Sequence, residues 1–184
     1  LSDGIRNIAI GYEALKNATS SDDNIAIGHQ ALAANNSGDF NIAIGKNVLT
    51  ANTTGAGNLG IGGNSLFNNT AGSNNVALGK SALFTNISGG NNTAIGVQVL
   101  TSSLGNGNSA LGYNALSTNT TGDFNTAMGL DALKSNSTGF NNTAIGNAAL
   151  LNNKTGTYNT AVGYNALVFS TTGSNNVAVG KNAL

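Results

Sequence analysis

Hydrophobic and polar positions along the chain follow a phrase that returns about every 17 residues. Its first clear copies read NIAIGYEAL (Asn7–Leu15), NIAIGHQAL (Asn24–Leu32) and NIAIGKNVL (Asn41–Leu49). The full phrase is N-x-A-[aliphatic]-G-x-x-A-L-x-x-N-x-[ST]-G-x-x, and it fills residues 1–184. Self-similarity at a fixed period is the signature of a repeat architecture. A catalytic site needs only one copy of its residues, so the phrase indicates a structural repeat and not a catalytic site.

Stacking the copies turns each position of the phrase into a column. The first Gly of the phrase (Gly11 to Gly180) and the Leu (Leu15 to Leu184) recur in every copy. The Gly that follows the [ST] position also recurs, with Ser21 as the exception. The opening column is Asn7, Asn24, Asn41, Asn58, Asn75, Asn92, Asn108, Asn125, Asn142, Asn159 and Asn176. We expect one single array with no second domain and no linker.

Each copy predicts one coil of an all-β, parallel β-solenoid, or β-roll. The stretch N-I-A-I-G alternates with period 2, as a short strand does, and ends at a Gly where the chain bends. E-A-L-K and its equivalents predict a second short strand, and N-T-T-G has the composition of a turn. About eleven coils stacked at the strand spacing of ~4.8 Å predict a rod of roughly 50 Å.

The core of such a coil comes from stacking like residues along the rod. Columns of the Ile10 and Leu15 type predict two aliphatic ladders, and the Asn columns predict ladders of side-chain amides. Small residues at Ala9 and Ala14 imply a close neighbour. Either a narrow roll is lined by Ala while Ile and Leu face a partner chain, or the reverse holds. Both arrangements leave little core per chain and favour association about a long axis.

One step is a residue short: Asn92 to Asn108 spans 16 residues. The deletion falls in the coil 92–107, within VLTSSLGNGN, and the strand columns resume in register after it. We expect it to shorten a turn and leave the strands intact.

The amino-acid composition limits the classes of partner that the chain can bind. Charged residues make up 8% of the chain, Lys plus Arg is 7 and Asp plus Glu is 7, whereas about 25% charge is typical of soluble domains. A neutral chain lacks the basic footprint of a nucleic-acid partner or of an anionic membrane surface. The chain has no Cys, which removes disulfides and thiolate chemistry, and no apolar run approaches the roughly 18 residues of a membrane span.

At N-x-A-I-G-x-x-A-L the sequence resembles the head repeats of YadA-like trimeric autotransporter adhesins. It is equally similar to the N-T-A-I-G-Y-x-A-L-x-x-N-T-T-G repeats of bacteriophage tail fibres, as in NTAVGYNAL (Asn159–Leu167) and LSTNTTGDFNTAMG (Leu116–Gly129). The resemblance covers essentially the whole chain and implies a left-handed roll and a homotrimer. Autotransporter heads commonly use a shorter coil, which favours the fibre-type relatives.

Residues that could carry chemistry are few. His29 is the only His, and a single His makes neither a His-based metal site nor a triad. Asp22 and Asp23 are the only adjacent acids and have the composition of a solvated turn, with weak calcium binding as the alternative. We therefore expect no catalytic, cofactor-binding or metal site, no cofactor and no enzyme activity.

Two further sets of residues have an ordinary explanation and a functional alternative. Several N-x-[ST] triplets match glycosylation acceptors, and they coincide with the turn of the repeat. Four aromatics lie in variable turn positions, form no continuous stripe and could contact a sugar. The triplets include Asn17, Asn52, Asn119, Asn136 and Asn153, and the aromatics are Phe40, Phe124, Phe140 and Tyr158.

The sequence thus predicts a non-enzymatic structural segment, the shaft or head of a trimeric phage tail fibre or cell-surface adhesin. We expect an extracellular location, on a virion or a bacterial surface, with host glycan or protein receptors bound by other regions of a longer fibre. A self-assembling extracellular filament and an ice-binding solenoid are the alternatives. The partial ladder Thr93, Thr126, Thr143 and Thr160 favours ice binding, and Ile8, Ile25 and Ile42 interrupt it.

Overall fold

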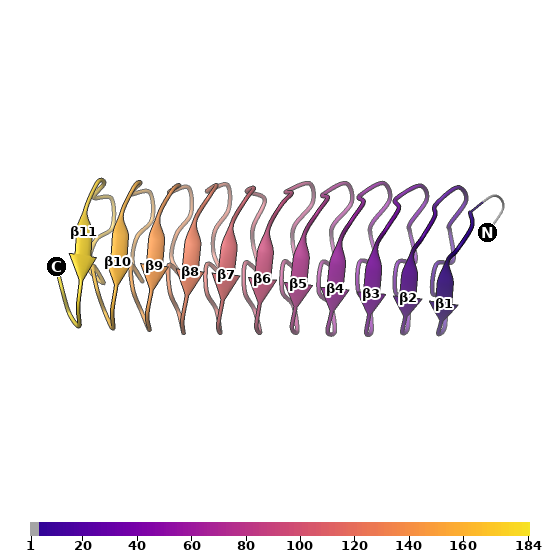
Figure 1. The fold of residues 1–184 in the computed structure, drawn as a ribbon, viewed down its shortest axis with the longest axis horizontal. Coiled ribbons are helices and arrows are strands. Elements are labelled where there is room, and N and C mark those ends of the chain that lie inside the picture. The colour runs from indigo at the N-terminus through magenta and orange to yellow at the C-terminus, as the bar shows by residue number, and fades with distance from the viewer. Residues whose placement is uncertain (1–3) are drawn as a thin grey trace.

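The computed structural model describes residues 4–184, and residues 1–3 of the predicted array lie outside this part. It is a parallel β-solenoid whose short strands form one continuous row along the rod (Figure 1). The sheet has 11 strands in sequence order, each paired with the next. The strands are β1 (Ile8–Ile10), β2 (Ile25–Ile27), β3 (Ile42–Ile44), β4 (Leu59–Ile61), β5 (Val76–Leu78), β6 (Thr93–Ile95), β7 (Ser109–Leu111), β8 (Thr126–Met128), β9 (Thr143–Ile145), β10 (Thr160–Val162) and β11 (Val177–Val179).

Adjacent strands pair in register, so that equivalent residues of the repeat lie side by side: Ile8 pairs with Ile25 and Ala9 with Ala26. This register holds across the short coil, where Thr93 of β6 pairs with Ser109 of β7. The missing residue is in the turn, since Ser103 and Gly105 are separated by one residue where other coils have two. Strand pairing is thus unaffected by the deletion.

The predicted second strand of each coil is wrong. In that stretch Glu13 and Leu15 have φ of 56° and 52°, and the equivalent residues of the later coils are also left-handed. The stretch is a run of turns, which we call the wound stretch, in which the Ala14 N–H donates to the Gly11 carbonyl and the Ala18 N–H to the Leu15 carbonyl, both at 3.3 Å. It still bonds to its neighbours, because the Leu15 N–H donates to the Ala31 carbonyl at 3.0 Å and the Gln30 N–H to the Tyr12 carbonyl at 2.8 Å. Each coil therefore has one strand and one wound stretch, and both are hydrogen-bonded between coils.

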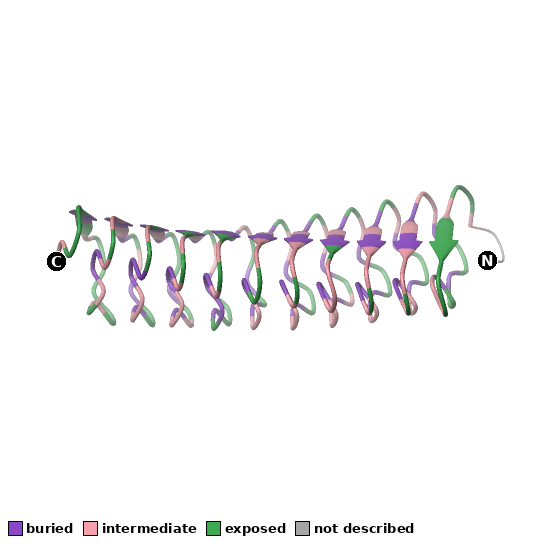
Figure 2. Cartoon of the chain, turned by 90° about the horizontal axis from the view of Figure 1, so that it is seen from below, coloured by how far each residue is buried: buried purple, intermediate pink, exposed green. Residues whose placement is uncertain are grey.

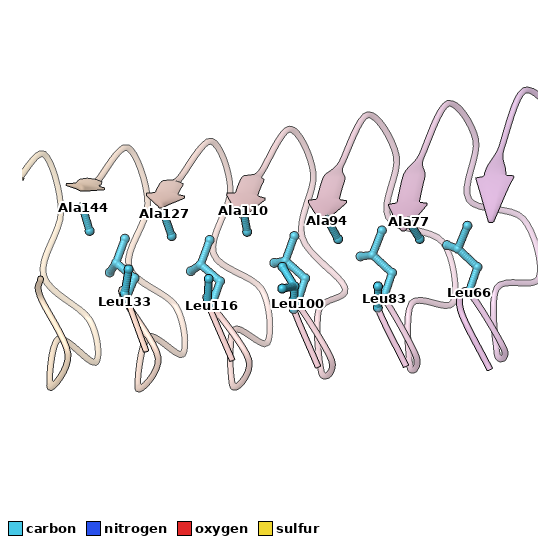
Figure 3. Close-up of a cluster of buried hydrophobic side chains, with 14 of the residues drawn as sticks. Leu66, Ala77, Leu83, Ala94, Leu100, Ala110, Leu116, Ala127, Leu133 and Ala144 are labelled. Atoms are coloured by element: carbon cyan, nitrogen blue, oxygen red, sulfur yellow. The ribbon is translucent and has the colours of Figure 1, made fainter. Parts of the chain in front are cut away.

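The core is a narrow file of Ala and Leu side chains (Figure 3). Ala26 on the inner side of β2 and Leu32 on the wound stretch are both fully buried. Ile10, by contrast, is 59% exposed on the outer side of its strand. The Leu column is the inner aliphatic ladder, and the Ile columns form an outer one. The roll is narrow because the strand contributes only a methyl group to the interior.

Two ladders of buried Asn run along the core, one continuous and one interrupted. In the strand ladder, which is the opening Asn column, the Asn58 N–H donates to Asn41 Oδ1 at 3.0 Å, and Asn58 Oδ1 accepts from the Asn75 N–H. In the turn ladder, formed by the Asn of N-x-[ST]-G, Asn69 Nδ2 donates to Asn52 Oδ1 at 2.8 Å. The amide ladders expected from the sequence are confirmed.

The two ladders meet at the carbonyl of the turn Gly. The Gly72 carbonyl accepts Asn58 Nδ2 at 2.8 Å and Asn69 Nδ2 at 2.9 Å. A Cβ on Gly72 would lie 2.4 Å from Asn69 Oδ1 and 2.4 Å from the Gly89 carbonyl oxygen. Any side chain here would therefore displace the amide network, which explains the strictness of the column.

Ser replaces Asn at two places in the turn ladder and leaves an acceptor without a donor. Ser103 follows Asn86, and Ser170 follows Asn153. The side-chain oxygens of Asn86 and Asn153 are buried and have no hydrogen-bond partner among the described residues. The Ser103 hydroxyl forms no bond to Asn86 Oδ1 of the preceding coil, although Ser103 Oγ accepts Asn119 Nδ2 of the following coil at 3.3 Å.

Removing one strand-ladder amide should destabilise the rod. Asn58→Ala leaves the buried Asn75 N–H without its acceptor, and a buried unpaired group of this kind costs about 1–3 kcal/mol. We expect a clear fall in the urea midpoint measured by circular dichroism. The control is Asn68→Ala, because Asn68 forms no side-chain hydrogen bond to any described residue and Ala fills its column at Ala34 and Ala51. Equal midpoints for the two variants would contradict a stabilising ladder.

Restoring Asn where Ser interrupts the turn ladder should stabilise the rod. Ser170→Asn places an amide opposite Asn153 Oδ1 and the Gly173 carbonyl, the two acceptors that this column uses elsewhere. The Ser170 N–H already bonds the Leu167 carbonyl at 3.1 Å, as the Asn153 N–H bonds that of Leu150. We expect a gain of about 1 kcal/mol, measured by the same denaturation, and no gain from Ser170→Ala.

Candidate functional site

The residues singled out for catalysis or metal binding are engaged in structural contacts. His29 is exposed, and its ring stacks on Tyr12 at a centroid distance of 5.3 Å. Asp22 Oδ1 accepts the Ile5 N–H at 2.8 Å. Within residues 4–184 there is no group of three His, Cys, Asp or Glu side chains that could hold a metal ion.

Asp23 is one half of a surface ion pair. Its two carboxylate oxygens accept Arg6 Nε at 2.5 Å and Arg6 Nη2 at 2.8 Å. The hydrogen bond from Arg6 lowers the pKa of Asp23. A lowered pKa in the folded state means that this contribution to stability is present above the unfolded pKa and is lost as the pH falls through the folded pKa. The pair links the corner before Asn7 to the equivalent corner of the following coil.

Four of the candidate glycosylation sites are inside the rod. Asn52, Asn119, Asn136 and Asn153 belong to the turn ladder and are fully buried. Their amides are bonded in the core, as with Asn136 Nδ2 and Asn119 Oδ1 at 2.8 Å. Asn17, in contrast, is exposed. The folded roll thus withholds the four ladder residues from any modifying enzyme.

The largest candidate surface is the outer face of the strand row, which we call the strand face. It consists of the first and third residue of each strand β1 to β11. The middle residue points inward, as the burial pattern of Thr143–Ile145 shows, and Figure 2 shows the row along one side of the rod. Exposed members along its length include Ile8 (48%), Ile61 (38%) and Val177 (76%). Neither of the two arrangements considered from the sequence is correct, because both placed Ile and Leu on the same side, whereas Ala and Leu line the interior together and the Ile columns face outward.

The face changes character along the rod. The third position stays aliphatic or Met throughout, whereas the first position is aliphatic in β1 to β5 and hydroxylic in β6 to β10. A shallow hollow of about 230 Å³ lies over β6, β7 and β8, and its lining includes Ile95, Ser109, Leu111 and Met128. Ser109 is the smallest side chain in its column, so the hollow marks the volume that is absent there.

The predicted Thr ladder lies on this same face. Thr126, Thr143 and Thr160 pair directly with one another across β8, β9 and β10. Each is partly buried, and the outward neighbour two residues later is Met128, Ile145 or Val162. The ladder is therefore a single row of hydroxyls beside an aliphatic row.

Comparison of the chain with protein-family models, with curated proteins and with solved structures finds no match. No helix in residues 4–184 has the length and apolar character needed to span a membrane.

Proposed function

We propose that this chain is a non-enzymatic structural segment, the shaft or head of a trimeric phage tail fibre or cell-surface adhesin. The observation that carries the proposal is the strand face, an unbroken row of outward aliphatic and hydroxyl side chains along 11 strands. Rod and face together suit a part that holds a binding tip away from a virion or a cell.

The length of the strand face supports association. Two outward side chains on each of the strands β1 to β11 form one contiguous surface along the sheet. Contiguous apolar patches above a few hundred Å² are rare on monomers and mark interaction sites. Association through a self-complementary face favours closed symmetry. The resemblance of the repeat to trimeric fibres and adhesins favours three copies.

The ladders support a mechanical role. Each coil is bonded to the next through strand pairing, through the wound stretch and through both Asn ladders, as at Asn58 and Asn69. Load along the rod is therefore shared by several parallel rows of hydrogen bonds. Amides and hydroxyls in the turns supply the solubility that charge supplies in ordinary domains.

The native mass of the segment tests the proposal. The chain is folded as a fusion to a neutral trimerisation tag, the tag is cleaved off, and light scattering measures the product. We expect a stable species of three times the 18.2 kDa chain mass. A folded monomer would contradict the trimeric fibre and direct attention to ice binding, measured as thermal hysteresis. Unlimited end-to-end growth would instead support the filament.

Charges placed on the strand face should separate the copies without unfolding the coil. Ile27→Asp with Ile44→Asp puts two carboxylates into the apolar contact, where each unpaired charge costs several kcal/mol. We expect dissociation to monomers with an unchanged circular dichroism spectrum.

The matched control is Ser37→Asp with Thr54→Asp, which adds the same charge to exposed turn positions of the same two coils. This variant should remain trimeric. If both pairs dissociate equally, net charge and not the strand face governs assembly.

A further inference from the structure

Three aromatic side chains gather at one corner of three successive coils, and we call this set the aromatic corner. Phe124, Phe140 and Tyr158 lie in the turns that precede β8, β9 and β10. Their side chains are 60%, 38% and 53% exposed. Such a cluster of exposed rings has no counterpart at the same corner of the other described coils, where Phe40 is the single aromatic residue.

The backbone at this corner disfavours bulky residues. Phe124 and Tyr158 have φ of 55° and 56°, a left-handed conformation that Gly and Asn adopt most easily. Gly57 and Asn74 occupy the same column in other coils. The same left-handed φ occurs at Asp23 and Phe40, so this turn geometry belongs to the repeat. Phe124 and Tyr158 are therefore bulky exposed residues in a turn that favours Gly or Asn.

The rings form a ledge that runs along the rod. The ring centroids of Phe140 and Tyr158 are 5.3 Å apart, with an interplanar angle of 78°. The Phe124 ring covers Gly107 of the preceding coil, where an added Cβ would come within 2.6 Å of its Cδ1. Phe124 and Tyr158 occupy one column two coils apart, a separation of about 9.6 Å at the strand spacing. That distance suits two alternate units of an extended sugar chain.

Polar groups without partners border the ledge. Asn141 lies between Phe124 and Tyr158 in the same column, and its side chain forms no hydrogen bond to any described residue. Asp123 uses Oδ1 to accept the Asn106 N–H at 2.7 Å, and its Oδ2 has no partner within residues 4–184. The turn residues 122–125, 139–142 and 156–159 contain no Lys or Arg. The corner therefore offers amide and carboxylate groups to hydroxyls, and no cation to a phosphate or sulfate.

We propose that the aromatic corner binds a neutral polysaccharide chain that lies along the rod. The apolar C–H faces of pyranose rings pack on Phe124, Phe140 and Tyr158, and Asn141 and Asp123 Oδ2 bond the sugar hydroxyls. Exposed apolar groups rimmed by polar side chains are the composition of a surface interaction site. Three rings on a convex corner are too small a surface for a protein partner, which needs about 800 Å².

Binding is measured by isothermal titration calorimetry on the folded 184-residue chain. The probes are cellohexaose, chitohexaose, mannohexaose and maltohexaose, with a sulfated heparin hexasaccharide as the charged comparator. We expect at least one neutral probe to bind and the heparin fragment not to bind. The triple variant Phe124→Asn, Phe140→Ser, Tyr158→Asn should weaken that binding at least about tenfold, which corresponds to about 1.4 kcal/mol.

The variant residues already occur in these columns at Asn74, Asn91 and Ser73, so the coils keep their fold. Phe40→Asn is the control, because it removes an exposed aromatic from the same column in a distant coil and should leave binding unchanged. No binding of any neutral probe at millimolar concentration, preference for the heparin fragment, or equal binding by the triple variant would overturn the proposal. The readout is independent of oligomeric state, so it stands apart from the test of the trimeric fibre.

Discussion

The whole rod depends on satisfying buried amides in a cross-section that has almost no room. The turn carbonyl at Gly72 accepts the side chains of Asn58 and Asn69, and the same two side chains donate to the Asn residues of the preceding coil. Because unpaired polar groups inside a protein are costly, each coil is stabilised when its neighbour supplies the matching amide. That mutual requirement explains why Asn, Gly and Leu repeat so strictly while the exposed columns vary freely.

Exceptions to the repeat occur together, and sterics explains why. Ser21 is the one residue that breaks the turn Gly column, and Ala18 stands three residues earlier where other coils have Asn or Ser. The missing Asn leaves space for the Ser side chain. Likewise Gly60 replaces Ala in the middle of β4, where an added Cβ would lie 2.6 Å from Val48 Cγ1. Val48 itself replaces the usual Ala, so the interior volume is conserved.

The period, the parallel sheet, the register across the short coil and the Asn ladders could all be predicted from the sequence, since each follows from columns of like residues. The wound stretch could not be predicted. Nothing in E-A-L-K indicates that Glu13 and Leu15 are left-handed, because Leu rarely adopts that conformation and does so here only where buried stacking compensates. The direction of the Ile columns was also undetermined, since Ala and Ile alternate equally well with either facing inward. The sequence shows no continuous aromatic stripe, because Phe140 stands one position earlier in its coil than Tyr158 does, yet the two rings are adjacent in space.

The short coil has a consequence for how the rod would fail. Between Asn86 and Asn119 the turn ladder passes through Ser103, which leaves Asn86 Oδ1 unpaired and holds Asn119 by a single 3.3 Å contact. The strand pairing of β6 with β7 is intact at the same level. A pulling force is therefore shared by fewer side-chain bonds at this seam than where Asn continues the ladder, and the same holds where Ser170 leaves Asn153 Oδ1 unpaired. Both Ser positions are points of weaker connection, where a stretched fibre would tear before the coils that have a complete ladder.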